Sequence, residues 1–133
     1  MKNFAQINAD NKVVNIIQCD DDATESSCNN LFNGNFKETW LDGSQRQRYA
    51  QVDGSYDPQK DVFIKPKPYS SWVLDSNNEW QAPITYPNST AWGTDDDVYP
   101  ILWDDNNQRW TGTARTAKTN LVWNSTFLSW EVL

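Results

Sequence analysis

Large apolar residues return at a fixed spacing along the chain. Five pairs in which a large apolar residue is followed seven positions later by another, with mostly polar residues between them, are interpreted as candidate hairpins. Positions i and i+7 face each other across a β-hairpin with a two-residue loop, so this spacing predicts cross-strand pairs. The predicted pairs are Ile7 with Val14, Tyr56 with Phe63, Val73 with Trp80, Trp103 with Trp110, and Trp123 with Trp130.

The residues between the paired positions favour a turn in most of these hairpins. Short polar side chains tolerate a positive φ and bond their own backbone, and they stand at three loop centres, Asp10-Asn11, Ser76-Asn77 and Asn106-Asn107. Asp57-Pro58 begins a turn through the fixed φ of proline, and because Gln59-Lys60 is an unusual two-residue centre, a longer loop is expected there. Thr126-Phe127 is a poor turn centre, so the last hairpin is predicted only from its two tryptophans and its alternating flanks.

One short helix is predicted near residues 22–33. Asp22 can cap its first turn together with Glu25, three residues further on. Gly34 is well placed to end the helix. We expect the Leu31-Phe32 pair to anchor it on a sheet.

The remaining pattern predicts an all-β fold. Strands are expected over residues 4–8, 13–18 and 48–52, and the hairpins join into a meander of antiparallel strands that is sandwich- or barrel-like. A chain of 133 residues fits a single domain. Within it, residues 1–87 form the predicted hairpin core with the helix, and residues 88–133 form Trp-rich hairpins as a peripheral extension.

Composition adds an aromatic core and an acidic surface. The hydrophobic fraction is 38%, but eight Trp, five Tyr and five Phe can supply much of the buried area. The net charge of −7 argues against a nucleic-acid partner, because phosphate binding depends on Lys and Arg. The apolar runs are too short for a membrane span, and MKNFAQIN lacks the apolar core of a signal peptide. We therefore expect neither membrane association nor export by the secretory route.

The chain has few residues that could bind a metal ion or take part in redox chemistry. Cys19 and Cys28 could close a short loop as a disulfide, but two semi-buried thiols are the preferred interpretation for a chain made in a reducing cytosol, and the question stays open. The chain has no histidine, so a zinc site would need more cysteines. Asp20, Asp21 and Asp22 lack the spacing of an EF-hand and are interpreted as an acidic helix start. No metal and no cofactor are expected.

No catalytic motif is found in the sequence. A Ser-His-Asp triad needs a histidine, and neither a GxSxG elbow nor a glycine-rich phosphate loop occurs. Eighteen acidic residues leave a two-carboxylate glycosidase open on counting alone. Most of those acids lie in predicted turns and caps, where they have structural roles. We therefore expect a protein that is not an enzyme.

Trp40 and Trp92 are among the tryptophans outside the pairing pattern. The tryptophans at hairpin positions are interpreted as cross-strand partners. Trp40 and Trp92 lie in turn-like surroundings instead. They are the candidates for contact with a partner protein or with the faces of sugar rings.

Two stretches of the sequence, FAQINADNKVVN and RYAQVDGSYDPQKDVFIKPKPYSSWVLDSNNEWQAP, resemble a group of small proteins encoded by marine tailed phages, including cyanophages. The shared features are the Phe-Ala opening, the Tyr-Asp and Asp-Val-Phe segment, the Pro-x-Pro connector before Ser-Trp, and a Trp-rich hairpin. The likeness covers about half the chain. After Pro87 this sequence departs from the group, since TGTARTAKTN and a second hairpin follow where many relatives end.

The resemblance implies a role rather than a reaction. Members of that group are mostly regarded as virion structural proteins or have no assigned role, and they offer no catalytic residues to transfer. The expectation is a non-enzymatic virion component, either a capsid decoration protein or a tail appendage, assembled in the host cytoplasm. Its expected partners are other virion proteins and further copies of itself. A carbohydrate-binding module for a host-surface glycan is the alternative, and an inhibitor of a host enzyme is a third hypothesis.

Overall fold

The computed structural model describes residues 1–93 and 95–133. The chain divides into two compact units, unit 1 with Met1–Lys67 and Ser76–Glu79, and unit 2 with Pro68–Asp75 and Trp80–Leu133. The named strands pair antiparallel in several small sheets, and one short helix accompanies them, so the predicted all-β class is confirmed. Over residues 1–93 and 95–133 the sheets do not close into a barrel. The two units divide after Lys67, whereas the sequence suggests a boundary near residue 87.

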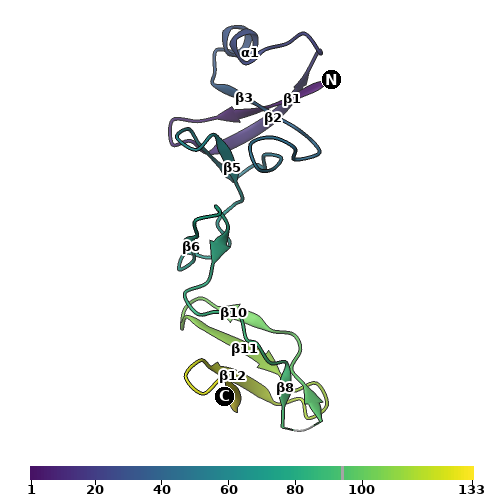
Figure 1. The fold of residues 1–133 in the computed structure, drawn as a ribbon, viewed down its shortest axis with the longest axis vertical. Helices are drawn as coiled ribbons and strands as arrows, with labels where there is room; N and C mark the ends of the chain where they lie inside the picture. The colour runs from purple at the N-terminus through teal and green to yellow at the C-terminus, as the bar shows by residue number, and fades with distance from the viewer. Residues whose placement is uncertain (94) are drawn as a thin grey trace. The chain divides into compact units, whose positions relative to one another are not determined.

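Unit 1 is built on a three-stranded sheet. Its strands β1 (Lys2–Ile7), β2 (Val13–Cys19) and β3 (Phe36–Thr39) lie in the order β2-β1-β3, so that β1 is central (Figure 1). Successive side chains of a strand point to opposite faces of the sheet. Phe4 and Ala5 are neighbours in β1, and both are completely buried. The sheet is therefore covered on both faces.

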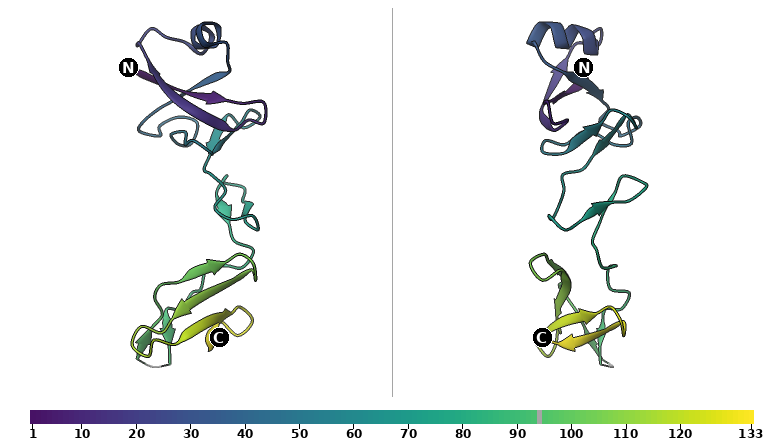
Figure 2. Two further views of the ribbon diagram at one scale, coloured as in Figure 1. Left: turned by 180° about the vertical axis from the view of Figure 1, so that it is seen from behind. Right: turned by 90° about the vertical axis from the view of Figure 1, so that its left-hand side faces the viewer.

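Helix α1 (Glu25–Phe32) covers one of these faces (Figure 2). Buried Cys28 of the helix packs in one cluster with Phe4 and Phe36 of the sheet. The helix begins with a capping box, in which Thr24 and Ser27 each accept a hydrogen bond from the backbone N–H of the other. It ends at Asn33, which takes the left-handed conformation.

These helix ends and contacts correct three expectations. Thr24 and not Asp22 is the N-cap, and Asn33 and not Gly34 takes the left-handed position. The Leu31-Phe32 pair anchors the helix only in part, because Leu31 is 76% exposed, whereas the half-exposed ring of Phe32 meets that of Phe36 in β3 at 5.8 Å between centroids. The helix is short enough that Cys28 alone provides its fully buried contact.

A hairpin and an irregular segment cover the other face of the sheet. Strands β4 (Ser55–Asp57) and β5 (Val62–Ile64) place Tyr56 opposite Phe63, with ring centroids 5.4 Å apart. Both rings pack with Ala5, Ile7, Val13 and Ala50. The strand predicted over residues 48–52 does not form, and the backbone of Ala50 donates instead to the side chain of Thr39, 2.8 Å away.

The register of the hairpins confirms three of the five predicted pairs and corrects two. Tyr56 pairs with Phe63, Trp103 with Trp110, and Trp123 with Trp130. Ile7 pairs with Val13 rather than Val14, and Trp80 pairs with Leu74 rather than Val73. In both wrong cases five residues separate the paired strand ends. A loop with an odd number of residues shifts the strand pairing by one position, so the side chain of the expected partner points to the other face of the hairpin.

The three confirmed hairpins have four-residue loops, which confirms the longer loop expected after Asp57 and corrects the two-residue loops expected in the other two hairpins. The residue that ends the first strand is Asp57, Asp104 or Asn124, and its side-chain oxygen accepts backbone N–H groups of the loop. The last loop residue has a positive φ, and this residue is Asp61, Gln108 or Leu128. A four-residue loop keeps the same i and i+7 partners as a two-residue loop, which explains why the three pairs were predicted correctly.

Unit 2 contains a four-stranded meander. Its strands are β10 (Leu102–Asp104), β11 (Arg109–Thr113), β12 (Asn120–Asn124) and β13 (Ser129–Val132), which pair in chain order (Figure 1). Two shorter hairpins precede it, β6 (Val73–Leu74) with β7 (Trp80–Gln81), and β8 (Ala91–Trp92) with β9 (Asp96–Asp97). The stretch of residues 111–120 ends β11, turns, and begins β12.

Tryptophan pairs form the core of unit 2. Trp103 and Trp110 meet edge to face at 5.0 Å between centroids, and Trp123 and Trp130 at 5.2 Å. All four are buried in one cluster that also contains Leu121. The preceding Pro-containing segment is bonded to this core, because the indole N–H of Trp110 donates to the carbonyl of Ile84 and that of Trp130 to the carbonyl of Ser89, each at 2.8 Å. The aromatic core that composition predicted is thus realised in unit 2.

Candidate functional site

The loop between β12 and β13 carries two exposed apolar side chains at its tip. Phe127 is 75% exposed and Leu128 is 56% exposed. Asn124 holds the loop in place by accepting the backbone N–H groups of Thr126 and Phe127, at 2.9 and 3.0 Å. We call Phe127 and Leu128 the apolar tip.

A hollow of about 310 Å³ lies beside the apolar tip within unit 2. Its lining includes Tyr86, Trp123 and Leu128. Tyr86 is 55% exposed and meets Trp110 edge to face at 5.0 Å between centroids. The tip therefore continues into an aromatic depression that a side chain of another protein could enter.

A second hollow, of about 540 Å³, lies beside Trp92. Trp92 is half-buried, packs against the tryptophan core, and pairs with Asp96 in the β8–β9 hairpin. Asp96 accepts the backbone N–H groups of Thr116 and Ala117, at 2.8 and 3.0 Å, and these bonds lower the pKa of its carboxyl. Asp96, Thr116 and Ala117 line the hollow with the indole ring. An aromatic ring beside polar groups is an arrangement that can stack on a sugar.

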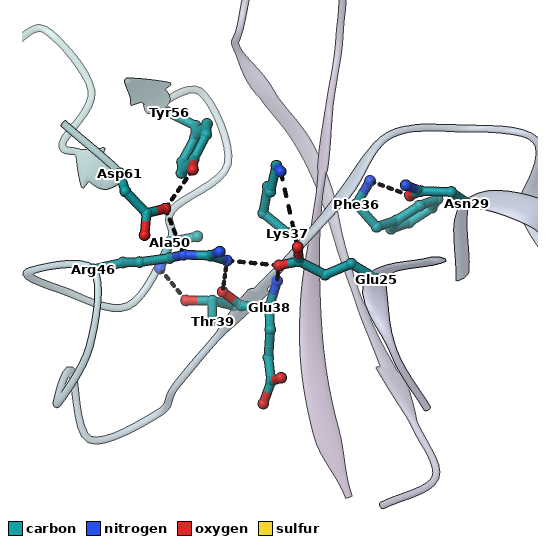
Figure 3. A network of polar contacts seen from close by, with 10 residues as sticks. All are labelled: Glu25, Asn29, Phe36, Lys37, Glu38, Thr39, Arg46, Ala50, Tyr56 and Asp61. Carbon is teal, nitrogen blue, oxygen red and sulfur yellow. Dashed lines mark hydrogen bonds and ion pairs between the residues drawn. The ribbon is translucent and has the colours of Figure 1, made fainter. Parts of the chain in front are cut away.

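In unit 1, a closed polar network surrounds Arg46 (Figure 3). The guanidinium is 16% exposed and donates to the carboxylate of Glu25 at 2.7 Å, to the backbone carbonyl of Glu38 at 2.9 Å, and to Asp61 at 2.8 Å. It also lies 5.7 Å from the centroid of the Tyr56 ring. The network thus ties α1, β3 and the β4–β5 hairpin together. Each of its charges faces an opposite charge, so we interpret it as structural.

The network changes the titration of two of its members. Burial and a hydrogen bond to Asp61 raise the pKa of Tyr56 to about 12. The hydrogen bond from Tyr56 and the charge of Arg46 lower the pKa of Asp61. Both shifts keep the pair in the form that bonds, a neutral phenol donating to an ionised carboxylate.

The two candidate tryptophans, Trp40 and Trp92, lie in different surroundings. Trp40 is half-buried, and the guanidinium of Arg46 lies 5.8 Å from its ring centroid, so it belongs to the network in unit 1. Trp92 lines a hollow. Of the two, Trp92 is the one whose surroundings suit a ligand.

Several acidic side chains hold loops together. Asp105 accepts hydrogen bonds from Ser71, Trp103 and Ser70, and these lower its pKa to about 2. Asp21 pairs with the N-terminal amine at 2.7 Å. Within residues 1–93 and 95–133, cysteine and acidic side chains form no group of three or more that could hold a metal ion. In the same residues, no helix is long and apolar enough to cross a membrane.

Sequence reasoning missed the apolar tip and Arg46. Thr126-Phe127 was noted only as a poor turn centre, although a poor turn residue at an otherwise clear hairpin is itself a signal of another role. Arg46 gave no signal, because Glu25, Glu38 and Asp61 are distant from it in the sequence. Comparisons with protein-family models, with curated proteins and with solved structures gave no match to the chain.

Proposed function

We propose that the protein is a non-enzymatic accessory component of a tailed-phage virion, a capsid decoration protein or a tail appendage, which docks on a neighbouring virion protein through the apolar tip. The observation that carries the docking role is the choice of residues in this loop. Exposed Phe127 and Leu128 stand where a hairpin loop ordinarily has polar residues. The phage context is supported by the sequence resemblance described above.

The other hairpin loops make the contrast clear. Each hairpin of at least three-residue strands, and the β6–β7 hairpin, has one loop residue with a positive φ. This residue is Asn11, Asp61, Asn78, Gln108 or Lys118 in five loops and Leu128 in the sixth. A branched apolar residue is disfavoured in that conformation, whereas Asn and Asp tolerate it. An apolar side chain kept there at a cost in stability is expected where its contact with a partner matters.

Mass spectrometry of purified particles tests the location. The protein should copurify with particles of the phage that encodes it, at a fixed copy number relative to the major capsid protein. Its absence from particles that are otherwise complete would overturn the proposal.

A double variant, Phe127→Ser with Leu128→Asn, tests the docking surface. It should fold and yet be lost from particles, because the exposed apolar area is removed and the turn itself is improved. The matched control is Asn107→Ser with Gln108→Asn, at the corresponding positions of the β10–β11 loop, and it should be incorporated normally. Equal incorporation of both variants would exclude the apolar tip as the docking surface.

The hollow beside Trp92 favours a second candidate function, binding of a host-surface glycan. Titration of tryptophan fluorescence with polysaccharide from the host envelope tests it. A saturable quench that is lost in Trp92→Ala and kept in Trp40→Ala would support the glycan-binding role. A titration without quench would leave the docking role as the function of unit 2.

A further inference from the structure

Two thiols face each other between the end of β2 and helix α1. Cys19 is the last residue of β2 and is half-buried, and Cys28 lies in α1 and is buried. Their sulfur atoms are 3.7 Å apart, and both are free thiols. The sulfurs of a disulfide lie about 2.0 Å apart, so roughly 1.7 Å of movement separates this pair from a bond.

The surroundings allow this movement and give a reagent access. Cys19 is followed by a turn, in which the N–H of Ala23 donates to the carbonyl of Asp20 at 3.0 Å. A hollow of about 430 Å³ has both cysteines in its lining. A small molecule in this hollow can therefore approach Cys19, which is half-buried, more readily than Cys28, which is buried.

We propose that Cys19 and Cys28 are a reversible dithiol–disulfide pair that links β2 to α1 when a low-molecular-weight disulfide is present. The inference concerns unit 1 and does not depend on the proposed function. Both side chains already lie in contact within the folded protein, so the bond forms without opening the sheet.

The reaction proceeds as thiol–disulfide exchange. The thiolate of Cys19 attacks one sulfur of the reagent and expels the other as a thiolate, which leaves a mixed disulfide on Cys19. The thiolate of Cys28 then attacks the Cys19 sulfur and expels the second thiolate. The protein loses two protons and two electrons in total, and the reagent is reduced to two thiols.

The order of attack follows from burial. Burial, together with the neighbouring Cys19, raises the pKa of Cys28 and disfavours its thiolate. Cys28 therefore reacts second, where the mixed disulfide is held beside it. Asp20 and Asp22 line the same hollow, so a neutral reagent should react faster than an anionic one such as oxidised glutathione.

Trapping of free thiols tests the proposal. The native protein is treated with hydroxyethyl disulfide, quenched with N-ethylmaleimide and weighed by mass spectrometry. We expect a monomer lighter by two hydrogen atoms that carries no maleimide, and two maleimides after reduction. Two maleimide-reactive thiols after the treatment, or disulfide-linked dimers as the sole oxidised product, would overturn the proposal.

Two serine variants assign the roles of the cysteines. Cys28→Ser should retain the mixed disulfide on Cys19, because the second attack cannot occur. Cys19→Ser should react at least tenfold more slowly than Cys28→Ser, because its remaining thiol is buried. Equal rates for the two variants would contradict the order of attack and remove Cys19 as the entry point.

The melting temperature tests whether the native fold accepts the bond. A cross-link reduces the conformational freedom of the unfolded chain, so the oxidised protein should melt several degrees above the reduced protein. A lower melting temperature after oxidation would mean that the disulfide distorts unit 1, and this result would overturn the proposal.

Discussion

Arg46 joins parts of unit 1 that are far apart in the sequence. Its guanidinium contacts Glu25 at the start of α1, the carbonyl of Glu38 in β3, and Asp61 in the β4–β5 loop. Its own backbone has a positive φ, as does that of Gln47. A residue held in this disfavoured conformation needs compensating contacts, and the network provides them.

Replacement of Arg46 by alanine should lower the free energy of unfolding by about 2 kcal/mol. Removal of one partner from a buried ion pair costs about 3–5 kcal/mol, and the partial exposure of Glu25 and Asp61 reduces that value here. Arg115→Ala is the matched control, since Arg115 is exposed, and it should change the free energy by less than about 0.5 kcal/mol. Denaturant unfolding of both variants provides the measurement, and equal effects would show that the network contributes no stability.

Tyr56 should make the protein sensitive to alkali. Its pKa is raised to about 12 in the folded state, whereas an unfolded tyrosine titrates near pH 10. The folded state thus favours the neutral phenol, and the stability gained from it is fully present below about pH 10 and lost as the pH rises toward 12. Tyr56→Phe has no such group, so its stability should approach or exceed that of the wild type across this interval. Parallel curves for the two proteins in unfolding experiments from neutral pH to pH 12 would refute the role of Tyr56.

At the scale of strands and hairpins, Gly112 lets a neighbouring segment lie directly on β11. A Cβ at this position would fall inside the contact distance of Val98 and would lie 3.3 Å from the ring of Trp130. Val98 forms an isolated bridge with Ala114 and is buried in the tryptophan cluster. Close packing of Val98 on the sheet therefore requires the absence of a side chain at residue 112.

Gly112→Ala should lower the free energy of unfolding by about 2 kcal/mol through overpacking. Val98→Ala removes the clashing methyl groups, so the double variant should lose less stability than the sum of the two single variants. A double-mutant cycle measured by denaturant unfolding checks this coupling. Strict additivity would indicate that Val98 and residue 112 do not compete for the same space.

The β12–β13 loop should become more stable when its apolar residue is removed. Leu128 has a φ of 53°, and Asn tolerates this conformation better than Leu does. Leu128→Asn should therefore raise the free energy of unfolding by about 0.5 kcal/mol. Phe127→Asn, at a neighbouring position with an ordinary φ, should not raise it. A loss of stability in Leu128→Asn would mean that Leu128 is kept for folding rather than for contact.

The elements also show what could be predicted from the sequence. The i and i+7 spacing located the hairpins, because an aromatic pair needs the same register whether the loop has two or four residues. The spacing failed for Ile7 and Val73, where a loop with an odd number of residues shifts the pairing by one position. The length of a loop depends on hydrogen bonds between its side chains and the backbone, and the spacing of apolar residues carries no information about these bonds. Trp92 was selected because it lies outside the predicted apolar pairs, and the hollow beside it depends on residues 116 and 117, which reach it only through the fold.

At the scale of the whole molecule, the two units have separate cores. The tryptophan cluster consists of unit 2 residues, and the two clusters around β1 consist of unit 1 residues. Every tryptophan except Trp40 falls within the residue ranges of unit 2. Cys28 is buried in unit 1. The chain therefore carries a distinct probe of unfolding for each unit.

These probes should report different transitions. In a Trp40→Phe background, tryptophan fluorescence follows unit 2, while the reaction of Cys28 with a thiol reagent follows unit 1, with Cys19 replaced by serine. Because no described core cluster is shared, we expect the two denaturant midpoints to differ, and Arg46→Ala should lower only the midpoint seen by the thiol. A single cooperative domain would instead give coincident midpoints that Arg46→Ala shifts together. That outcome would restore the one-domain organisation that the sequence alone suggested.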